Sequence, residues 1–171
     1  MSGHFGVVGA GNMGSGIAQK MAAEGFRVTL IDVDEARVSR GLQNIQATLA
    51  EGVARRVLTE DEAAAVASRV RGSAVLGDLA DADLVVEAVF EDVAIKRDLF
   101  RRLDEVCRVD AILATNTSSF SVSELASATR RPERVIGLHY FYHPAKNRLV
   151  EVVPGAASHP DRKSTRLNSS H

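Results

Sequence analysis

The chain has 171 residues, of which 45% are hydrophobic and 25% are charged, as is usual for a globular domain with a buried core. Its net charge of −1, with acidic and basic residues interspersed, argues against binding to nucleic acid or to a membrane surface. The single cysteine, Cys107, excludes a disulfide framework and a cysteine metal site, and we expect no bound metal. The N-terminus, Met-Ser-Gly-His, has no signal-sequence pattern, so we expect a cytoplasmic protein.

The first predicted strand, Phe5 to Val8, leads directly into Gly9-Ala10-Gly11-Asn12-Met13-Gly14, which has the form G-x-G-x-x-G. This motif is weak evidence by itself, because glycine-rich turns are common. Here an apolar face at helical spacing follows it and ends at Gly25, and a second strand runs from Val28 to Ile31. That strand ends in Asp32, 18 residues after the last glycine and close to the roughly 20 expected for an acid that binds the adenosine ribose.

Each part of this unit has a physical role in binding a dinucleotide. Gly9 permits a tight turn, Gly11 lets the backbone approach a pyrophosphate, and Gly14 lets the helix pack closely on the strand. The first N–H groups of the helix bind phosphates, and the Asp32 carboxylate accepts hydrogen bonds from the ribose and repels a 2′-phosphate. The alternative is a turn that binds no ligand, and the presence of Asp32 favours the dinucleotide. We therefore predict NAD as the cofactor, held by Gly9, Gly11, Asn12, Met13, Gly14 and Asp32.

Two helices are predicted next. The segment from Asp34 to Glu51 has apolar residues at helical spacing, and Thr59-Glu60-Asp61-Glu62 begins another helix with a capping-box pattern. Together they predict an antiparallel helical pair after the second strand. The basic pair Arg55-Arg56 near its joint is typical of a solvated turn, which we favour over contact with an anionic ligand.

A continuous apolar run from Asp83 to Val89 predicts a parallel strand that is buried on both faces. Ligands of open parallel sheets bind beyond the carboxyl ends of the strands, which makes Glu87 and Glu91 candidate site residues.

The helix predicted from Val93 to Val106 is capped by Asp92. Lys96 lies near its start, and Glu91 precedes it by five residues. These two residues either contact a ligand or form a simple charge pair at the beginning of the helix, and the sequence pattern alone does not favour the ligand. The buried stripe of this helix is expected to consist of Ile95, Leu99 and Leu103.

Polar residues follow the next predicted strand, Ala111 to Ala114. The cluster from Thr115 to Ser119 lies at the carboxyl end of that strand, where the nicotinamide of a bound cofactor is expected. Such clusters often only satisfy loop backbone, and here we favour a functional role. Ser121 with Glu124 is predicted to cap a short helix.

Two further strands, Val135 to Phe141 and Leu149 to Val153, carry a candidate acid–base pair. His139 lies on the first strand, and Glu151 follows 12 residues later on the second. If the strands pair, the carboxylate fixes the tautomer of the imidazole and stabilises its charged form. Taken alone, a histidine among apolar neighbours is more often a core residue, and His143 has the same status without a matched acid.

The order of these elements predicts an α/β fold, a doubly wound and mostly parallel Rossmann sheet with a helical-pair insertion after its second strand. We assign residues 1–157 to this domain and residues 158–171 to a polar, disordered tail. The last eleven residues, DRKSTRLNSSH, look like the translated read-through of a sequencing-adapter oligonucleotide and are left out of the fold prediction.

Five segments in this order resemble the NAD-binding domain of the L-3-hydroxyacyl-CoA dehydrogenase family, which includes the 3-hydroxybutyryl-CoA dehydrogenases. They are GAGNMGSGIAQ, VVEAVFED, ATNTSSFS, GLHYF and LVEVV, and the resemblance extends from Phe5 to about Pro154. It implies NAD-dependent oxidation of (3S)-3-hydroxyacyl-CoA to 3-ketoacyl-CoA, or the reverse, in fatty-acid and butanoate metabolism. It also implies that the full-length protein is a homodimer with an acyl-CoA substrate.

The resemblance further implies a role for each matched residue. His139 matches the catalytic base of the family, Glu151 matches its acidic partner, and Ser118 matches a serine that contacts substrate and cofactor. These three are the catalytic candidates. The cofactor-binding set is extended by Glu91, Lys96 and Asn116.

The chain departs from the family pattern on the substrate side. Where the family commonly reads HFFNP, this chain reads HYFYHP from His139 to Pro144, so Tyr142 replaces the asparagine that usually touches the cofactor. The family's CoA-binding lysine has no clear match in the helical pair. The acyl-chain preference therefore stays open.

Family members continue with a helical domain that supplies much of the substrate site and most of the dimer interface. We expect this chain to be an N-terminal fragment without that domain, inactive alone. The alternatives are a non-catalytic NAD-binding module and another β-hydroxyacid dehydrogenase, and the ATNTSS and GLHYF segments argue against the second.

Overall fold

The computed structural model describes residues 3–147 and 149–158. Within them, seven strands form one sheet in the order β3-β2-β1-β4-β5-β6-β7. Neighbouring strands are parallel from β3 to β6, and β7 runs antiparallel to β6. The strands are β1 (His4–Val8), β2 (Arg27–Ile31), β3 (Val70–Ser73), β4 (Leu84–Glu87), β5 (Ile112–Thr115), β6 (Val135–Tyr140) and β7 (Val150–Pro154).

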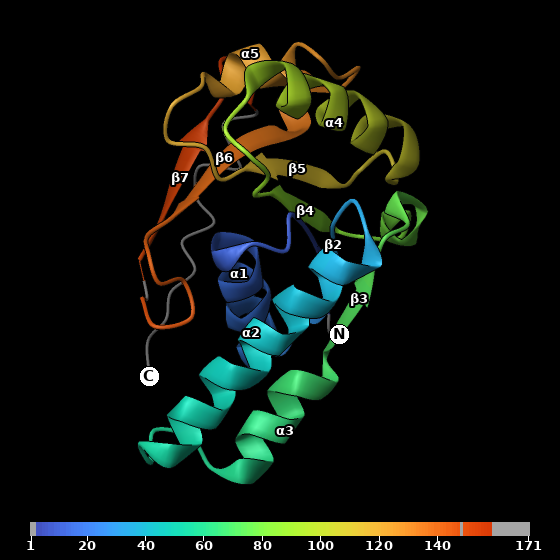
Figure 1. The fold of residues 1–171 in the computed structure, drawn as a ribbon. Helices are drawn as coiled ribbons and strands as arrows, with labels where there is room; N and C mark the ends of the chain where they lie inside the picture. Colours follow the sequence, from blue (N-terminus) through green and yellow to red (C-terminus); the bar gives the residue numbers. More distant parts are fainter. Residues whose placement is uncertain (1–2, 148, 159–171) are drawn as a thin grey trace.

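Helices cover both faces of the sheet (Figure 1). One face carries α1 (Asn12–Ala23), α2 (Glu35–Ala54) and α3 (Glu60–Ser68). The other face carries α4 (Val93–Val106), α5 (Val122–Ala126) and the short 3₁₀ helix η1 (Leu76–Leu79), and a second one, η2 (Pro132–Arg134), precedes β6. No helix in the described part of the chain is both long enough and apolar enough to cross a membrane.

The central strands are buried on both sides because they supply side chains to two separate cores. Val7 and Val86 belong to the core beneath α1 and α2, while Val8 and Val85 belong to the core beneath α4 and α5. Successive side chains of a strand point to opposite faces, so a strand with helices on both sides needs a continuous apolar sequence. This requirement is why the run in β4 predicted a buried parallel strand.

The predicted doubly wound Rossmann fold is confirmed, including the helical pair between β2 and β3 (Figure 1). The capping box of α3 is present, because the Thr59 N–H donates to Glu62 Oε2 at 2.8 Å and the Glu62 N–H donates to Thr59 Oγ1 at 3.2 Å. The edge strand β3 was not predicted, since its sequence, VRGS, has an arginine and a glycine in place of an apolar run.

Two local predictions are wrong. Ile95 was expected in the buried stripe of α4 but is 51% exposed, and Lys96 takes the buried position beside Leu99 and Leu103. The helix is rotated this way because the Lys96 ammonium forms an ion pair with the carboxylate of Glu87 on β4. Ser121 is the N-cap residue of α5, but its side chain makes no capping bond within the described residues, and its carbonyl oxygen accepts from the Leu125 N–H instead.

The predicted tail lies almost wholly outside the described residues. Its first residue, Ser158, is attached to the sheet, because its hydroxyl donates to the carbonyl oxygen of Val135 at 2.9 Å. Residues 159–171, which include the adapter-like segment, are not among those described.

Candidate active site

The glycine loop between β1 and α1 is shaped by contacts that require glycine. Gly9 has a φ of +105°, and a Cβ on it would lie 2.4 Å from the carbonyl oxygen of Ala88. A Cβ on Gly14 would lie 1.7 Å from the carbonyl oxygen of Gly9, so α1 packs directly on the loop. A Cβ on Gly11, in contrast, would meet no described atom within 4 Å. The loop is tight at Gly9 and Gly14 and open at Gly11, which is the geometry that a phosphate approaching the backbone requires.

The first turn of α1 presents backbone donors at this opening. Gly11 is its N-cap residue, with an extended backbone and no side-chain capping bond from the described residues, and the turn contains no acidic residue. The first N–H groups of a helix have no carbonyl partner inside it and carry the positive end of its dipole. Asn12 and Met13 supply two of these groups. The opening therefore fits a pyrophosphate.

Asp32, which follows β2, is tied to the glycine loop. Its Oδ2 accepts a hydrogen bond from the Ala10 N–H at 2.7 Å, and its Oδ1 accepts one from the Val33 N–H at 2.7 Å. Each carboxylate oxygen can accept a further bond, so the ribose hydroxyls of NAD fit here. Arg37, the first arginine after Asp32 in the sequence, has its Nε 3.5 Å from Asp34 Oδ2. Among the described residues no basic side chain forms an ion pair with Asp32, so a 2′-phosphate would be repelled here.

Glu87 and Lys96 form an ion pair that is closed to solvent. Glu87, at the carboxyl end of β4, is 0% exposed, and Lys96, on α4, is 1% exposed. The Lys96 ammonium donates to Glu87 Oε1 at 2.5 Å and lies 3.5 Å from Glu91 Oε1. The charge pair considered for Glu91 and Lys96 therefore exists, but the lysine's closer partner is Glu87. Glu91 itself is exposed at the carboxyl edge of the sheet.

His139 and Glu151 face each other across β6 and β7. They are direct partners in the antiparallel register, and His139 Nδ1 lies 3.4 Å from Glu151 Oε2. The side chains are 28% and 60% exposed, respectively, so the pair is open to solvent. The ring of Phe141 packs beside the imidazole, with centroids 4.8 Å apart. The structure thus brings together the predicted acid–base pair, which depended on whether the two strands pair.

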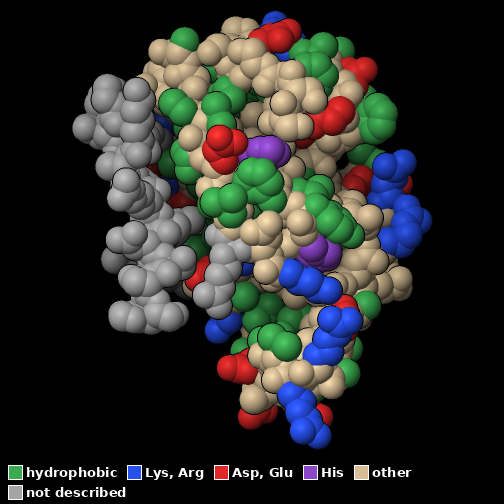
Figure 2. All heavy atoms as spheres, turned by 90° about the vertical axis from the view of Figure 1, so that its left-hand side faces the viewer, with side chains coloured by type: hydrophobic (Ala, Val, Ile, Leu, Met, Phe, Trp, Pro, Cys, Tyr) green, Lys and Arg blue, Asp and Glu red, His purple; other side chains and the backbone are tan. Residues whose placement is uncertain are grey.

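Asn116 and Ser118 follow β5 and lie near this pair. Asn116 Oδ1 accepts a hydrogen bond from the Tyr140 N–H at 2.8 Å, which joins the loop after β5 to the end of β6. Ser118 is exposed and lines a cavity of about 430 Å³ together with His139 and Glu151. Figure 2 shows this side of the molecule, on which histidine and acidic side chains lie among apolar ones.

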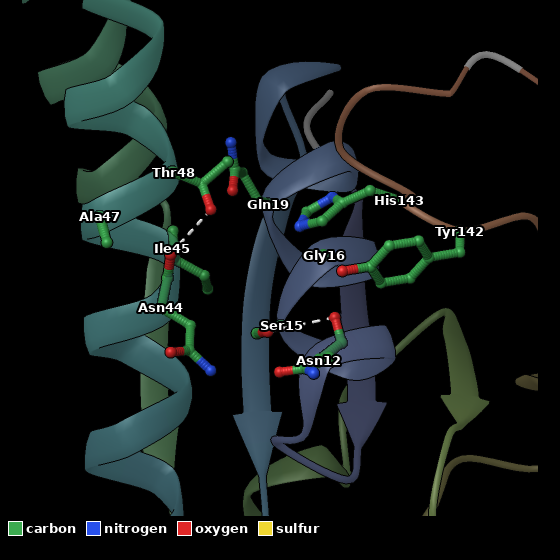
Figure 3. A pocket seen from close by; sticks show the side chains of 10 residues that line it. All are labelled: Asn12, Ser15, Gly16, Gln19, Asn44, Ile45, Ala47, Thr48, Tyr142 and His143. Atoms are coloured by element: carbon green, nitrogen blue, oxygen red, sulfur yellow. Dashed lines mark hydrogen bonds between the residues drawn. The ribbon is translucent and has the colours of Figure 1, made fainter.

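A second cavity, of about 210 Å³, lies between α1 and α2 and was not predicted (Figure 3). Asn44 and Thr48 line it from α2, and Tyr142 and His143 line it from the loop after β6. Asn12 of the glycine loop also reaches it, so this cavity adjoins the cofactor cradle. It is assembled from segments about 100 residues apart in the sequence, which is why no local pattern indicated it.

Other reactive groups do not join the site. Burial raises the pKa of the Cys107 thiol to about 11, so it stays protonated and unreactive at neutral pH. Burial also raises the pKa of Tyr140 to about 12, and its hydroxyl lies against Met21 Sδ at 3.4 Å. Among the described residues, no group of three His, Cys, Asp or Glu side chains could hold a metal ion.

Comparison with known proteins agrees with this geometry. The family described as "3-hydroxyacyl-CoA dehydrogenase, NAD binding domain" matches residues 4–168. A 3-hydroxybutyryl-CoA dehydrogenase of Bradyrhizobium diazoefficiens is 43% identical over 153 residues, which cover 90% of this chain and 52% of the relative. A 3-hydroxyadipyl-CoA dehydrogenase of Escherichia coli is 40% identical over 152 residues, 89% of this chain and 32% of the relative.

Solved structures show the same similarity. The crystal structure of a 3-hydroxybutyryl-CoA dehydrogenase from Escherichia coli superposes with a TM-score of 0.91 at 38% identity, over 94% of this chain and 34% of that one. The (S)-3-hydroxybutyryl-CoA dehydrogenase from Ralstonia eutropha gives a TM-score of 0.91 at 34% identity, over 94% of this chain and 57% of that one. The chain thus spans about half the length of several curated relatives. The family match over almost the whole chain, on a fold with an NAD cradle of the expected geometry, shows that the chain belongs to the 3-hydroxyacyl-CoA dehydrogenase family, of which it is the NAD-binding domain.

Proposed function

We propose that the protein to which this domain belongs oxidises (3S)-3-hydroxyacyl-CoA to 3-ketoacyl-CoA with NAD, or catalyses the reverse reduction. The observation that carries the proposal is the pairing of His139 with Glu151 in a cavity that also contains Ser118. This cavity lies at the same carboxyl edge of the sheet as the glycine loop and Asp32. A proton acceptor and a dinucleotide cradle on one edge are what the oxidation of an alcohol requires.

In this proposal His139 is the general base. Its Nδ1–H donates to Glu151, which leaves Nε2 free to accept the proton of the C3 hydroxyl. The bound cofactor contributes the acceptor for the hydride that leaves C3. The Glu151 carboxylate stabilises the imidazolium that forms, and the same proton returns to the substrate oxygen in the reverse direction. A base in such a position contributes a factor of about 10² to 10⁴ to the rate.

The remaining candidates have supporting roles in the proposal. The exposed Ser118 hydroxyl donates a hydrogen bond to the substrate oxygen, since it shares the cavity with His139. Asn116 holds the end of β6 through the Tyr140 N–H and so fixes the position of the base. Glu91 contacts the cofactor from the carboxyl edge. Lys96 acts on the cofactor through Glu91, because its ammonium is buried and 3.5 Å from that carboxylate.

The substrate side also involves parts of the protein outside the matched region. Curated relatives extend well beyond it, and we infer that a further helical domain completes the acyl-CoA site and forms a dimer. The open exposure of His139 and Glu151 supports this inference, because a proton acceptor works best where water is excluded. A cytoplasmic location, in line with a single buried cysteine, is part of the same proposal.

One experiment separates a complete catalyst from an NAD-binding module. The purified 171-residue chain is mixed with NADH and acetoacetyl-CoA, and nicotinamide absorbance and fluorescence are followed. We expect NADH to bind without being oxidised, because the substrate side is open. Oxidation would show that the domain is active by itself, and a lack of NADH binding would contradict the cofactor site.

A further inference from the structure

Glu87 is a buried charged group that the proposed chemistry does not use. Both of its oxygens accept hydrogen bonds. Oε1 accepts from the Lys96 ammonium at 2.5 Å and from the Val89 N–H at 2.8 Å, and Oε2 accepts from the Thr115 hydroxyl at 2.7 Å. The carboxylate therefore joins the end of β4 to the end of β5 and to the first turn of α4. Burying two opposite charges costs solvation free energy, so an apolar pair would serve a purely structural purpose equally well.

The ion pair continues to the surface through a chain of contacts. The Lys96 ammonium, already bound to Glu87, lies 3.5 Å from Glu91 Oε1. The other oxygen of Glu91, Oε2, accepts from the Thr117 hydroxyl at 2.7 Å. The Thr117 hydroxyl oxygen in turn accepts from the Ser119 N–H at 3.1 Å. The backbone N–H of Thr117 donates to the Thr115 hydroxyl oxygen at 3.2 Å. One connected network thus begins at Glu87, includes the exposed Glu91 carboxylate and ends in the turn that carries Ser118.

The position of this network in the sheet indicates which part of the cofactor it serves. Asp32 would hold the adenosine ribose beyond β2, and the glycine loop would hold the pyrophosphate beyond β1. His139 lies on β6, so the nicotinamide half of an extended dinucleotide would run over the ends of β4 and β5. Glu87 and Thr115 are at those two ends, directly opposite each other in the register.

We propose that Glu87 is a positioning residue for the nicotinamide half of the cofactor site. It holds the Lys96 ammonium below the carboxyl edge, and the ammonium and Thr117 together fix the Glu91 carboxylate and the Ser118 turn. Without the Glu87 charge, Lys96 has Glu91 as its remaining carboxylate partner and draws it away from Thr117. This inference rests on the proposed function, because it requires NAD to lie along this edge.

The test uses two probes of the cofactor site and the substitution Glu87→Gln in the full 171-residue chain. NADH contains both halves of the cofactor, whereas ADP-ribose lacks the nicotinamide. We expect the dissociation constant of NADH to rise about tenfold and that of ADP-ribose to change less than about twofold, since hydrogen bonds to charged groups are worth more than one factor of ten in affinity. Both constants are measured by calorimetric titration, and that of NADH also by nicotinamide fluorescence.

Asp104→Asn is the matched control for the loss of a buried charge. Asp104 lies on the same helix as Lys96, is equally part of an ion pair, and binds Arg130 at 2.8 Å and Arg131 at 2.7 Å, away from the network. This variant should lower thermal stability without changing the ratio of the two affinities. If Glu87→Gln gives the same ratio of NADH to ADP-ribose affinity as Asp104→Asn, the ion pair of Glu87 with Lys96 is only structural and the inference is overturned.

Two further outcomes are decided by the same data. If Glu87→Gln does not fold, Thr117→Val replaces it, because this substitution nearly preserves volume and removes the hydroxyl that links Glu91 to the turn at Ser119. It should weaken the binding of NADH more than that of ADP-ribose, and an unchanged ratio of the two affinities would again overturn the inference. If the unsubstituted chain binds ADP-ribose but not NADH, the positioning role is overturned while the cradle stands. If it binds neither, the proposed function fails and the inference fails with it.

Discussion

The two halves of the candidate site are built in different ways. The cofactor cradle is made of backbone, with the Gly14 Cα packed against the Gly9 carbonyl and the Ala10 N–H bound to Asp32. The proposed catalytic half is made of side chains, with His139 and Glu151 3.4 Å apart and both partly exposed. Backbone packed to this degree cannot adjust, whereas exposed side chains can change rotamer at little cost. The cradle is therefore preorganised in this domain, and the catalytic half depends on what covers it.

The largest effect is expected from His139→Asn in the complete protein. Turnover should fall by a factor of about 10² to 10⁴, because the proton acceptor is lost. NADH affinity should stay within about twofold, since the glycine loop and Asp32 follow β1 and β2, which are not neighbours of β6 in the sheet. Glu151→Gln keeps the base and removes the charge that stabilises it, so its loss of turnover should be smaller. Steady-state kinetics with acetoacetyl-CoA measure both, and unchanged turnover in His139→Asn would show that this residue is not the base.

Gly14→Ala tests whether the cradle is rigid. A Cβ there would lie 1.7 Å from the Gly9 carbonyl oxygen, and neither backbone segment can move easily, so we expect a loss of about 3 kcal/mol in the free energy of unfolding. Gly11→Ala is the matched control, because a Cβ there meets nothing within 4 Å. It should change stability by less than about 1 kcal/mol and weaken NADH binding about tenfold, since the methyl group enters the phosphate opening. Denaturant titration and NADH titration distinguish the two effects.

Asp32→Asn tests the choice of cofactor. Asparagine can still accept from the Ala10 N–H through its carbonyl oxygen and loses only the bond from the Val33 N–H, so the loop should keep its shape. The negative charge that repels a 2′-phosphate is lost, and we expect the ratio of NADH to NADPH affinity to fall about tenfold. Parallel titrations with the two cofactors measure this ratio. A ratio that does not change would mean that the carboxylate does not select NAD.

The smallest effect is expected from Asp104→Asn as a function of pH. Burial raises the pKa of the Asp104 carboxyl, but hydrogen bonds from Arg130 and the charge of Arg131 outweigh burial and hold it below its ordinary value of 3.8. A lowered pKa in the folded state stabilises the protein above pH 3.8, and this stabilisation is lost as the pH falls through the lowered value. At pH 7 the variant should lose about 1 kcal/mol in the free energy of unfolding, which lowers its melting temperature by a few degrees. The difference in melting temperature between the two proteins should shrink below about pH 4. A constant difference across this range would exclude an ionised Asp104 as its cause.

Much of the fold could be predicted because its signals are local. The strand before the glycine loop, the helix after it and the capping box at Thr59 each depend on residues close in sequence. β3 was not predicted because an edge strand needs no apolar run. Ile95 was misplaced for a different reason, since helical periodicity assigns buried positions to apolar residues and does not include a carboxylate on another strand that buries Lys96 instead. A glutamate inside the continuous apolar run of β4 was the available signal that such a partner exists.

By itself, the sequence determined the Rossmann fold and the identity of the dinucleotide, because the glycine spacing and the acid after β2 lie within one short unit. It also determined the family, because five short segments follow one another in the family's order. The tertiary structure decided which distant residues meet. It set the register that places His139 opposite Glu151, brought Tyr142 and His143 against α1 and α2, and buried Lys96 on Glu87 rather than on Glu91. The physical reason is that these contacts join separate strands and helices, and their geometry depends on sheet order and helix rotation, which no local sequence pattern specifies.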